Sequence, residues 1–447
     1  MFKKILEFFS ALAPAANRVS PDKVKGLYNR LRWSVFLSAT LGYGMFYVCR
    51  LSLSVIKKPL VDAGILTEKD LGIVGSALFF SYAVGKLANG FLADRSNVRR
   101  FMATGLLLTA LINIALGFPL TFIAFTLLWG LNGWFQSMGS APSVISLSRW
   151  FSNHERGTYY SIWSTSHSIG KGITYVVIAS IVSFAGWQWG FWGAGLIGLI
   201  GAAVVALFMR DSPESEGLPS IADYKNDHAA ISTSGKSVGT LQKEVLKNPY
   251  IWILAFSSAL MYISRYAIES WGIFYLQAKQ GYSGIEASSI VSVSAISGIV
   301  GTFISGFISD RFFNGSRNVP ALVAGIINVI SLSVFLYYPG AGIFVYTLSM
   351  ITFGFAIDIL ITFLGGLMAV DIASKKASGA ALGLIGIASY MGAGIQDVVS
   401  GMLIGDGRST INGIESYDFS VVRIFWLGAA IASVILTLFV WNAKAKD

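Results

Sequence analysis

Charged residues, cysteine and histidine are all scarce in this chain of 447 residues. Only 13% of the residues are charged, whereas a typical soluble domain has about 25%, so an ordinary soluble protein is excluded. Cys49 is the only cysteine, which excludes an internal disulfide and a cysteine-based zinc cluster. We recognise no nucleotide-binding loop and no grouping of nucleophile, base and acid. We therefore expect neither an enzyme nor a cofactor.

Apolar residues dominate what is present: 54% of the chain is hydrophobic and the mean hydropathy is +0.64. A membrane-spanning helix needs about 20 mostly apolar residues. The apolar runs are continuous, without the ten-residue alternation of barrel strands, and therefore predict helices. The twelve predicted spans lie near residues 31–55, 69–93, 101–118, 120–147, 159–184, 188–209, 249–278, 286–308, 319–339, 341–370, 377–403 and 420–442.

The net charge of +10 could indicate a nucleic-acid partner, but the positions of the charges indicate membrane topology instead. Most of the 33 Lys and Arg residues fall in the termini and in alternate loops, on one side of the predicted membrane. By the positive-inside rule, both termini are expected in the cytoplasm. We expect contact with membrane lipid and a monomer, and no nucleic-acid partner.

The chain divides into two halves that resemble each other. A polar segment at 210–248 separates six predicted spans in 1–209 from six in 249–447, and we expect it to be a partly ordered cytoplasmic linker. A motif of glycine, aspartate and arginine recurs at an offset of 216 positions; its residues are Gly90, Asp94 and Arg95, then Gly306, Asp310 and Arg311. A twofold repeat with polar residues inside the spans is typical of secondary transporters. We interpret the motif as a conformational latch.

Two arginines, Arg50 and Arg265, lie inside apolar spans, and each follows a tyrosine (Tyr47, Tyr262) by three residues. An arginine at membrane depth costs about 3 kcal/mol on insertion scales. Because the two occupy matching places, we predict an anion bound between the halves, and the planar guanidinium suits phosphate or carboxylate. The alternative is a permanent ion pair with an acid. Only Arg265 has such an acid nearby in sequence, Glu269 at i+4.

Further polar residues fall within the predicted spans and are expected to face the interior of the bundle. They are Lys86, Lys171, Glu269, Asp358 and Asp397, with His167 as a titratable neighbour. Tyrosines accompany the cations: Tyr43 and Tyr47 share the helix face of Arg50, and Tyr82 precedes Lys86 by four residues. A phenol can donate to an anion, or stack on a guanidinium, without adding charge.

Four segments together resemble the organophosphate:phosphate antiporters of the major facilitator superfamily: 43–50, 81–86, 163–170 and 262–271. The resemblance extends over essentially the whole chain. It implies an all-α membrane fold of twelve transmembrane helices in two six-helix halves related by pseudo-twofold symmetry. It also implies exchange of an organophosphate for inorganic phosphate by rocker-switch alternating access, in a bacterial inner membrane.

The resemblance assigns roles to individual residues. Arg50 and Arg265 would clamp the phosphate, while Lys86 and His167 would line the cavity with Trp163 nearby. The tyrosines that would ring the phosphate are Tyr43, Tyr47, Tyr82 and Tyr262.

The organic part of the substrate is harder to assign because the chain departs from the family pattern there. Lys171 and Asp358 are additions, which could form an interhelix pair or touch the substrate. Gln396 stands where some hexose-phosphate carriers pair an acid with a lysine. Glu269, at the fourth place after Arg265, favours hexose 6-phosphate over glycerol 3-phosphate and phosphoglycerates. A sugar-phosphate sensor and proton-coupled uptake remain as alternatives.

Overall fold

The computed structural model describes residues 2–227, 238–313, 316–338, 342–373, 378–411, 414–441 and 443. Helices account for nearly all of the described chain, and its strands form a single short hairpin. Within the described residues, eleven helices are long and apolar enough to cross a membrane. The protein is therefore an all-α membrane protein, as the hydropathy predicted.

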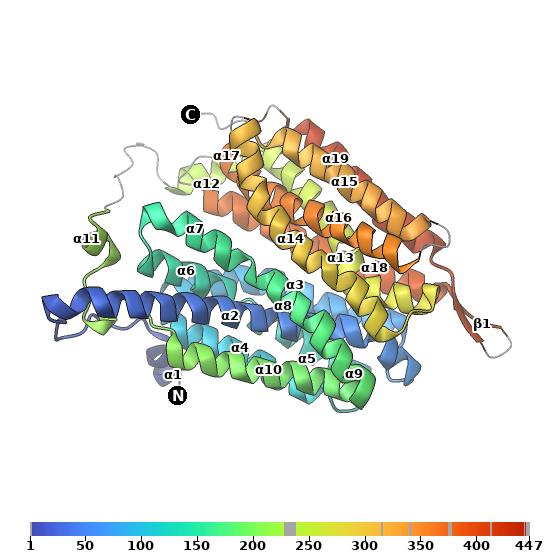
Figure 1. Ribbon diagram of the computed structural model, residues 1–447, viewed down its shortest axis with the longest axis horizontal. Coiled ribbons are helices and arrows are strands. Elements are labelled where there is room, and N and C mark those ends of the chain that lie inside the picture. The colour runs from blue at the N-terminus through green and yellow to red at the C-terminus, as the bar shows by residue number, and fades with distance from the viewer. Residues whose placement is uncertain are drawn as a thin grey trace.

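The first half of the chain builds one helical bundle, which we call the N-terminal bundle (Figure 1). Its elements are α2 (Pro21–Asp62), α3 (Glu68–Asp94), α4 (Val98–Leu116), α5 (Phe122–Gln136), α6 (Ser140–Trp150), α7 (Asn153–Ser164), α8 (Ser166–Ile173), the π-helical turn η1 (Thr174–Ile178), α9 (Ala179–Ala185) and α10 (Trp187–Phe208). The predicted span at 120–147 is divided into α5 and α6. Pro142, at the start of α6, has no N–H to donate to the preceding turn, which disfavours one continuous helix there. This division explains why eleven helices, and not twelve, meet the length criterion in the described chain.

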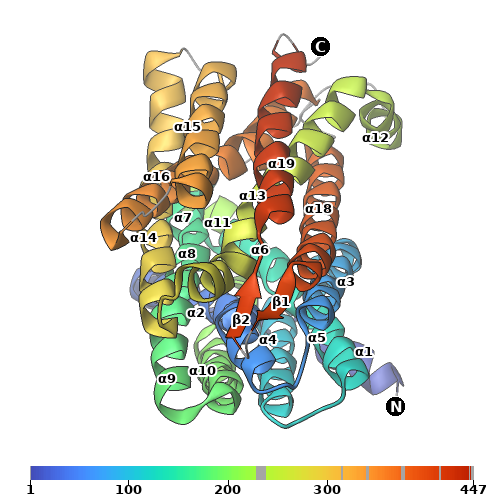
Figure 2. The ribbon, with the colours of Figure 1, turned by 90° about the vertical axis from the view of Figure 1, so that its right-hand side faces the viewer.

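The second half builds the C-terminal bundle, which lies beside the first (Figures 1 and 2). Its elements are α13 (Pro249–Gln280), α14 (Gly284–Phe312), α15 (Asn318–Tyr337), α16 (Ile343–Thr362), the π-helical turn η3 (Phe363–Leu367), α17 (Met368–Ile372), α18 (Ser378–Asp406), the strands β1 (Arg408–Ile411) and β2 (Ile414–Tyr417), and α19 (Ser420–Phe439). Helix α3 packs on α18, α2 on α13 and α8 on α14, so these pairs form the interface between the bundles.

The amino terminus and the linker contribute short helices outside the bundles: α1 (Phe2–Phe9), the 3-10 turn η2 (Glu214–Glu216), α11 (Ile221–Lys225) and α12 (Val238–Lys247). The linker is anchored by Asp211, which is buried and accepts hydrogen bonds from the backbone N–H groups of Leu12 (2.9 Å) and Val98 (3.0 Å) and pairs with Arg149 (2.7 Å). Tyr224 of α11 stacks on Tyr28 of α2 at 4.2 Å between ring centroids. Residues 211–227 of the linker are therefore ordered against the N-terminal bundle, whereas α12 packs on α13 and α18 of the other bundle.

The same capping arrangement starts α3 and α14. Thr67 caps α3 and exchanges hydrogen bonds with Asp70, and Ser283 caps α14 and exchanges hydrogen bonds with Glu286. This capping box satisfies backbone donors that the first turn of a helix leaves free. The two caps are 216 positions apart, which is the offset of the glycine–aspartate–arginine motif. The repeat therefore extends to the ends of these two helices.

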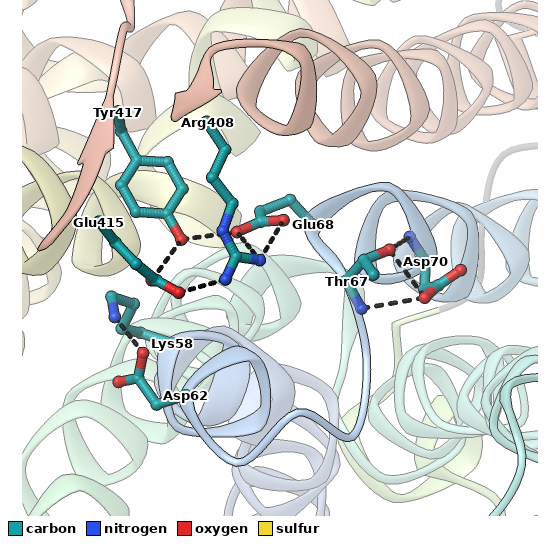
Figure 3. Close-up of polar contacts among 8 residues, drawn as sticks. All are labelled: Lys58, Asp62, Thr67, Glu68, Asp70, Arg408, Glu415 and Tyr417. Atoms are coloured by element: carbon teal, nitrogen blue, oxygen red, sulfur yellow. Dashed lines mark hydrogen bonds and ion pairs between the residues drawn. The ribbon is translucent and has the colours of Figure 1, made fainter. Parts of the chain in front are cut away.

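The bundles meet closely at the end of the molecule that carries the β-hairpin, which we call the hairpin end. A Cβ added at Gly72 of α3 would lie 2.7 Å from the backbone oxygen of Asp397 and 3.0 Å from Cα of Gly401 in α18. Close beside this contact, Glu68 accepts hydrogen bonds from the Tyr417 hydroxyl (2.6 Å) and from Arg408 (3.4 Å), both in the hairpin (Figure 3). The first turn of α3 is thus tied to the opposite bundle.

The opposite end, towards which α1 and the end of α19 extend, is the terminal end, and there the bundles separate (Figure 1). Asp94 and Arg95 are exposed, and within the described chain they form no ion pair with the other bundle. A Cβ added at Gly90 or at Gly306 would meet nothing within 4 Å. Arg311 is also exposed, while the side chain of Asp310 lies outside the described residues. The structure therefore does not bring the predicted latch residues of the two bundles together.

A candidate anion-binding site between the bundles

Arg50, on α2 of the N-terminal bundle, is buried and has no carboxylate partner among the residues that the structure describes. Its guanidinium lies 4.2 Å from the ring centroid of Tyr82 and 4.8 Å from that of Tyr47, and its Nη1 donates to the Tyr390 hydroxyl at 3.4 Å. Across the described chain, no carboxylate forms an ion pair with it, and its Nε has no hydrogen-bond partner. Phenol rings stabilise a guanidinium by cation–π contact but do not neutralise it. The site therefore holds a buried positive charge that an anion would neutralise.

Arg265, on α13 of the C-terminal bundle, is equally buried but faces an acid. Its Nε lies 3.1 Å from Oε2 of Glu269, as the i+4 spacing predicted. The two atoms are not aligned as a hydrogen bond, and Nη2 of Arg265 has no partner among the described residues. Rings of Tyr262 and Tyr266 lie 5.3 Å from the guanidinium. Arg265 therefore keeps donor capacity for a ligand.

Glu269 also joins the two bundles. Its Oε1 accepts from the Lys171 ammonium of α8 at 3.0 Å, and its backbone oxygen accepts from the Tyr175 hydroxyl of η1 at 3.1 Å. Both charged side chains of the Lys171–Glu269 pair are only 1% exposed. Because removing one partner of a buried ion pair costs about 3–5 kcal/mol, this pair holds α8 against α13 in the present conformation.

Aromatic rings form a belt around the arginines, in two groups that the Arg50 guanidinium bridges between Tyr47 and Tyr82. In the N-terminal bundle, Tyr43 stacks on Trp163 at 4.8 Å, and Tyr47 contacts both Tyr43 and His167 at 5.6 Å. The belt crosses to the C-terminal bundle where Tyr82 meets Tyr390 at 4.4 Å. It then continues to Tyr262 at 5.5 Å. The tyrosines that the sequence placed around the site do lie there.

His167 and Asp358 meet across the interface. Nε2 of His167 lies 3.8 Å from Oδ2 of Asp358 in α16, and the Ser168 hydroxyl donates to the same oxygen at 3.3 Å. Nδ1 of His167 faces the backbone oxygen of Ser164. The predicted Lys171–Asp358 pair is therefore replaced by two separate pairs, Lys171 with Glu269 and His167 with Asp358.

Two predicted site residues differ from the rest in their surroundings. Lys86 is exposed, with its ammonium 5.5 Å from the ring of Tyr390, so it borders the belt from the terminal side. Gln396 is buried inside the C-terminal bundle, where it donates to the Ser400 hydroxyl at 3.0 Å. Among the described residues, no hydrogen bond joins Gln396 to either arginine, so the structure does not place it in the site.

The sequence interpretation missed a further ion pair across the interface. Lys57 lies beyond the end of the span predicted near residues 31–55, but α2 continues to Asp62 and buries it. Its ammonium lies 3.2 Å from Asp397, 2.7 Å from the Ser270 hydroxyl and 3.6 Å from the ring centroid of Trp271. Lys57, Ser270 and Asp397 line a small cavity together with Arg50 and Glu269, and its water-accessible volume is about 20 Å³. The end of an apolar run does not indicate that a lysine just beyond it is buried, because the acid that pairs with this lysine is 340 positions away in the sequence.

Two further residues of the site, Tyr390 and Tyr266, also escaped prediction. Tyr390 is the only hydrogen-bond acceptor of Arg50 within the described chain, although it comes from the other bundle. Tyr266 directly follows Arg265, and that adjacency was the one available signal.

At the hairpin end, outside the spans, the polar contacts keep ordinary charge states. Burial raises the pKa of the Tyr417 phenol, which therefore remains a neutral donor to Glu68. A hydrogen bond to Glu415 raises the pKa of the Arg408 guanidinium, which stays a cation (Figure 3). Glu68 thus receives one neutral and one charged hydrogen bond from the hairpin.

Two helical bundles that enclose buried cations at their interface define the class of secondary membrane transporters. Residues 10–396 match the family model of the Major Facilitator Superfamily, and the chain belongs to this family. Relatives of the chain include membrane transporters, and the chain is of this transporter type and not an enzyme.

Curated relatives resemble the chain over most of its length. It is 32% identical to the membrane sensor protein UhpC of Salmonella typhimurium, over 88% of this chain and 89% of the relative. It is 31% identical to a probable hexose phosphate transport protein of Chlamydia trachomatis, over 96% and 94%. It is 32% identical to the glycerol-3-phosphate transporter of Bacillus subtilis, over 97% and 98%.

Solved structures agree on the fold. A bacterial homolog of the human lysosomal transporter Spinster, in an inward-facing and unoccupied conformation, superimposes with a TM-score of 0.68 at 17% identity, covering 93% of this chain and 95% of that one. The nucleoside transporter NupG also gives 0.68 at 17% identity, covering 92% and 98%.

Proposed function

We propose that this chain is a secondary active antiporter that exchanges an organic phosphate ester for inorganic phosphate. The observation that carries the proposal is Arg50, a buried guanidinium without an acid among the described residues, beside a second arginine with unused donors. A phosphate offers oxygens to both guanidinium groups at once. Relatives described as hexose phosphate and glycerol-3-phosphate transporters support this ligand class.

Alternating access follows from the placement of the cations. Arg50 and Arg265 come from different bundles, so a phosphate bound to both draws the bundles together around it. The phosphate competes with Glu269 for Arg265, and the terminal side then closes as the hairpin side opens. In that opposite state, the motif residues Gly90, Asp94 and Arg95 meet the other bundle, with Gly306, Asp310 and Arg311 in the matching place. Residues 1–209 and 249–447 are the two moving units, joined by 210–248.

Hexose 6-phosphate is the proposed organic substrate. Glu269 lies one turn beyond Arg265, the spacing that favours this branch of the family, and it contacts both Arg265 and Lys171. Glycerol 3-phosphate and phosphoglycerates are the alternative substrates. We place the protein as a monomer in a bacterial inner membrane, with both termini in the cytoplasm.

Exchange by purified protein in proteoliposomes tests the proposal. Vesicles loaded with phosphate should accumulate labelled glucose 6-phosphate, and empty vesicles should not. A pH gradient without internal phosphate should give no accumulation. Uptake driven by the pH gradient alone would refute phosphate exchange and would show that uptake is coupled to protons.

A sensor is the second candidate function, because the membrane sensor protein UhpC is as similar to this chain as the transporters are. A sensor binds the sugar phosphate without moving it. Saturable binding by the detergent-solubilised protein, combined with no uptake into phosphate-loaded vesicles, would support the sensor and defeat the antiporter.

A further inference from the structure

Asp358 is a buried acid with an unused oxygen. The side chain is 1% exposed, and its two recorded polar contacts, with Ser168 and His167, both use Oδ2. Oδ1 has no hydrogen-bond partner among the described residues. Leaving a buried carboxylate oxygen without a donor is costly, so this oxygen favours any donor that enters the site.

The surroundings hold Asp358 in place without neutralising it through lysine. A Cβ added at Gly298 of α14 would lie 2.1 Å from Oδ2, so the glycine provides the space that the carboxylate occupies. Lys171, the cation that the sequence suggested as a partner for Asp358, directs its ammonium to Glu269 instead. Asp358 therefore faces the partly exposed His167 as its ion-pair partner across the interface.

Chains of side-chain contacts connect Asp358 to both arginines. His167, its neighbour on α8, contacts Tyr47 of the aromatic belt, and Tyr47 contacts Arg50. Lys171 is one helical turn beyond His167 and leads through Glu269 to Arg265. One turn separates Cβ atoms by about 5–6 Å. Inorganic phosphate would occupy the arginines alone, while the carbon chain of a phosphate ester would extend towards Asp358.

We propose that Asp358 is the specificity-determining residue for the organic part of the substrate, which its unpartnered oxygen recognises by accepting a hydrogen bond from a hydroxyl group. The proposal rests on the phosphate-ester exchange proposed above. A hydrogen bond from a substrate hydroxyl to Asp358 favours polyhydroxylated phosphomonoesters such as sugar phosphates. Asp358 also disfavours phosphate esters that carry a carboxylate, such as phosphoglycerates, because a carboxylate brought next to Asp358 is repelled.

Competition against labelled phosphate exchange tests this assignment through opposite effects on two ligands. Asp358→Asn keeps the shape and removes the charge. Inhibition constants are expressed relative to the one for inorganic phosphate on the same protein. In the variant, this ratio for glucose 6-phosphate should rise about tenfold or more, and the ratio for 3-phosphoglycerate should fall. Asp62→Asn, which removes an exposed acid of α2, is the matched control and should change neither ratio. An unchanged preference between the two ligands in Asp358→Asn would overturn the proposal.

Wild-type protein provides a test that does not depend on the variant being folded. Among the monodeoxy analogues of glucose 6-phosphate, at least one should bind about tenfold more weakly than the parent. On the Asp358→Asn variant, the same analogue should bind less than about twofold more weakly than glucose 6-phosphate does. Equal binding of every analogue would reject the hydroxyl contact while leaving phosphate exchange intact. A wild-type protein that binds no phosphate would instead overturn the proposed function and this inference together.

Discussion

At the scale of single residues, the two arginines differ in what their surroundings provide. Arg50 has aromatic rings and one phenol hydroxyl, while Arg265 has a carboxylate at ion-pair distance. An incoming anion therefore gains the first site without a competitor and must displace Glu269 at the second. In the proposed exchange, this asymmetry would make Arg50 the anchor and Arg265 the group whose partner changes.

Lysine cannot replace arginine at either place. Arg50→Lys and Arg265→Lys each keep the charge and lose the planar pair of donors, so phosphate exchange should fall by roughly two orders of magnitude. Arg423→Lys is the matched control, because Arg423 also lies over a tyrosine ring (Tyr337, 4.9 Å) but outside the site. Exchange assays in proteoliposomes, with size-exclusion profiles to verify folding, measure the effect. Near-normal exchange by either site variant would refute the arginine pair.

Glu269→Gln should separate affinity from turnover. Removing this acid frees Arg265 and Lys171, so we expect phosphate to bind several-fold more tightly and to be released more slowly, with a lower exchange rate. Lys171→Met should have the opposite effect on affinity, because Glu269 then pairs with Arg265 alone. Binding titrations and single-turnover exchange give the two quantities. If both variants bind phosphate as the wild type does, Glu269 is not its competitor.

At the scale of elements, the hydropathy pattern located nearly all the helices, because a spanning helix needs a long apolar run and little else. It did not locate the break between α5 and α6, which depends on one proline, nor the end of α2, where a lysine is buried against Asp397. The hairpin also escaped prediction because its strands are only four residues each. Pairings between distant positions, such as Arg50 with Tyr390, have no signature in a single sequence.

The hairpin contributes to closing its end of the molecule. Glu68→Gln and Tyr417→Phe each weaken the hydrogen bonds between α3 and the hairpin, so molecules open at the hairpin end should become more frequent. Spin labels at Ala63→Cys and Thr410→Cys, two exposed positions, would report a longer distance component in the variants. Lys58→Gln is the control, because it breaks an ion pair within α2 at the same end. Identical distance distributions in all variants would show that the hairpin contacts do not hold this end closed.

At the scale of the whole molecule, the sequence predicted the twofold repeat and the cations between its halves, but not which end is closed. The sequence of an alternating carrier must support both conformations. It therefore contains the contacts of each state but does not indicate which state a given structure has. The structure records the state in which Lys57–Asp397, Lys171–Glu269 and the glycine contact of α3 with α18 are all formed. The exposed motif at the terminal end, with Asp94 and Arg95, then belongs to the other state.

The glycine contact gives the sharpest test of this assignment. In Gly72→Ala, the new Cβ would lie 2.7 Å from the Asp397 backbone oxygen, a rigid group, so α3 and α18 must move apart. Overpacking of this kind costs about 1–3 kcal/mol, which corresponds to roughly a 5- to 150-fold shift between the two conformations. Gly26→Ala is the matched control, because it adds the same methyl group to a helix where nothing lies within 4 Å. Gly72→Ala should therefore slow exchange and lengthen the spin-label distance at the hairpin end, while Gly26→Ala should do neither. Phosphate exchange by Gly72→Ala at the wild-type rate would mean that this contact does not separate when the carrier changes state.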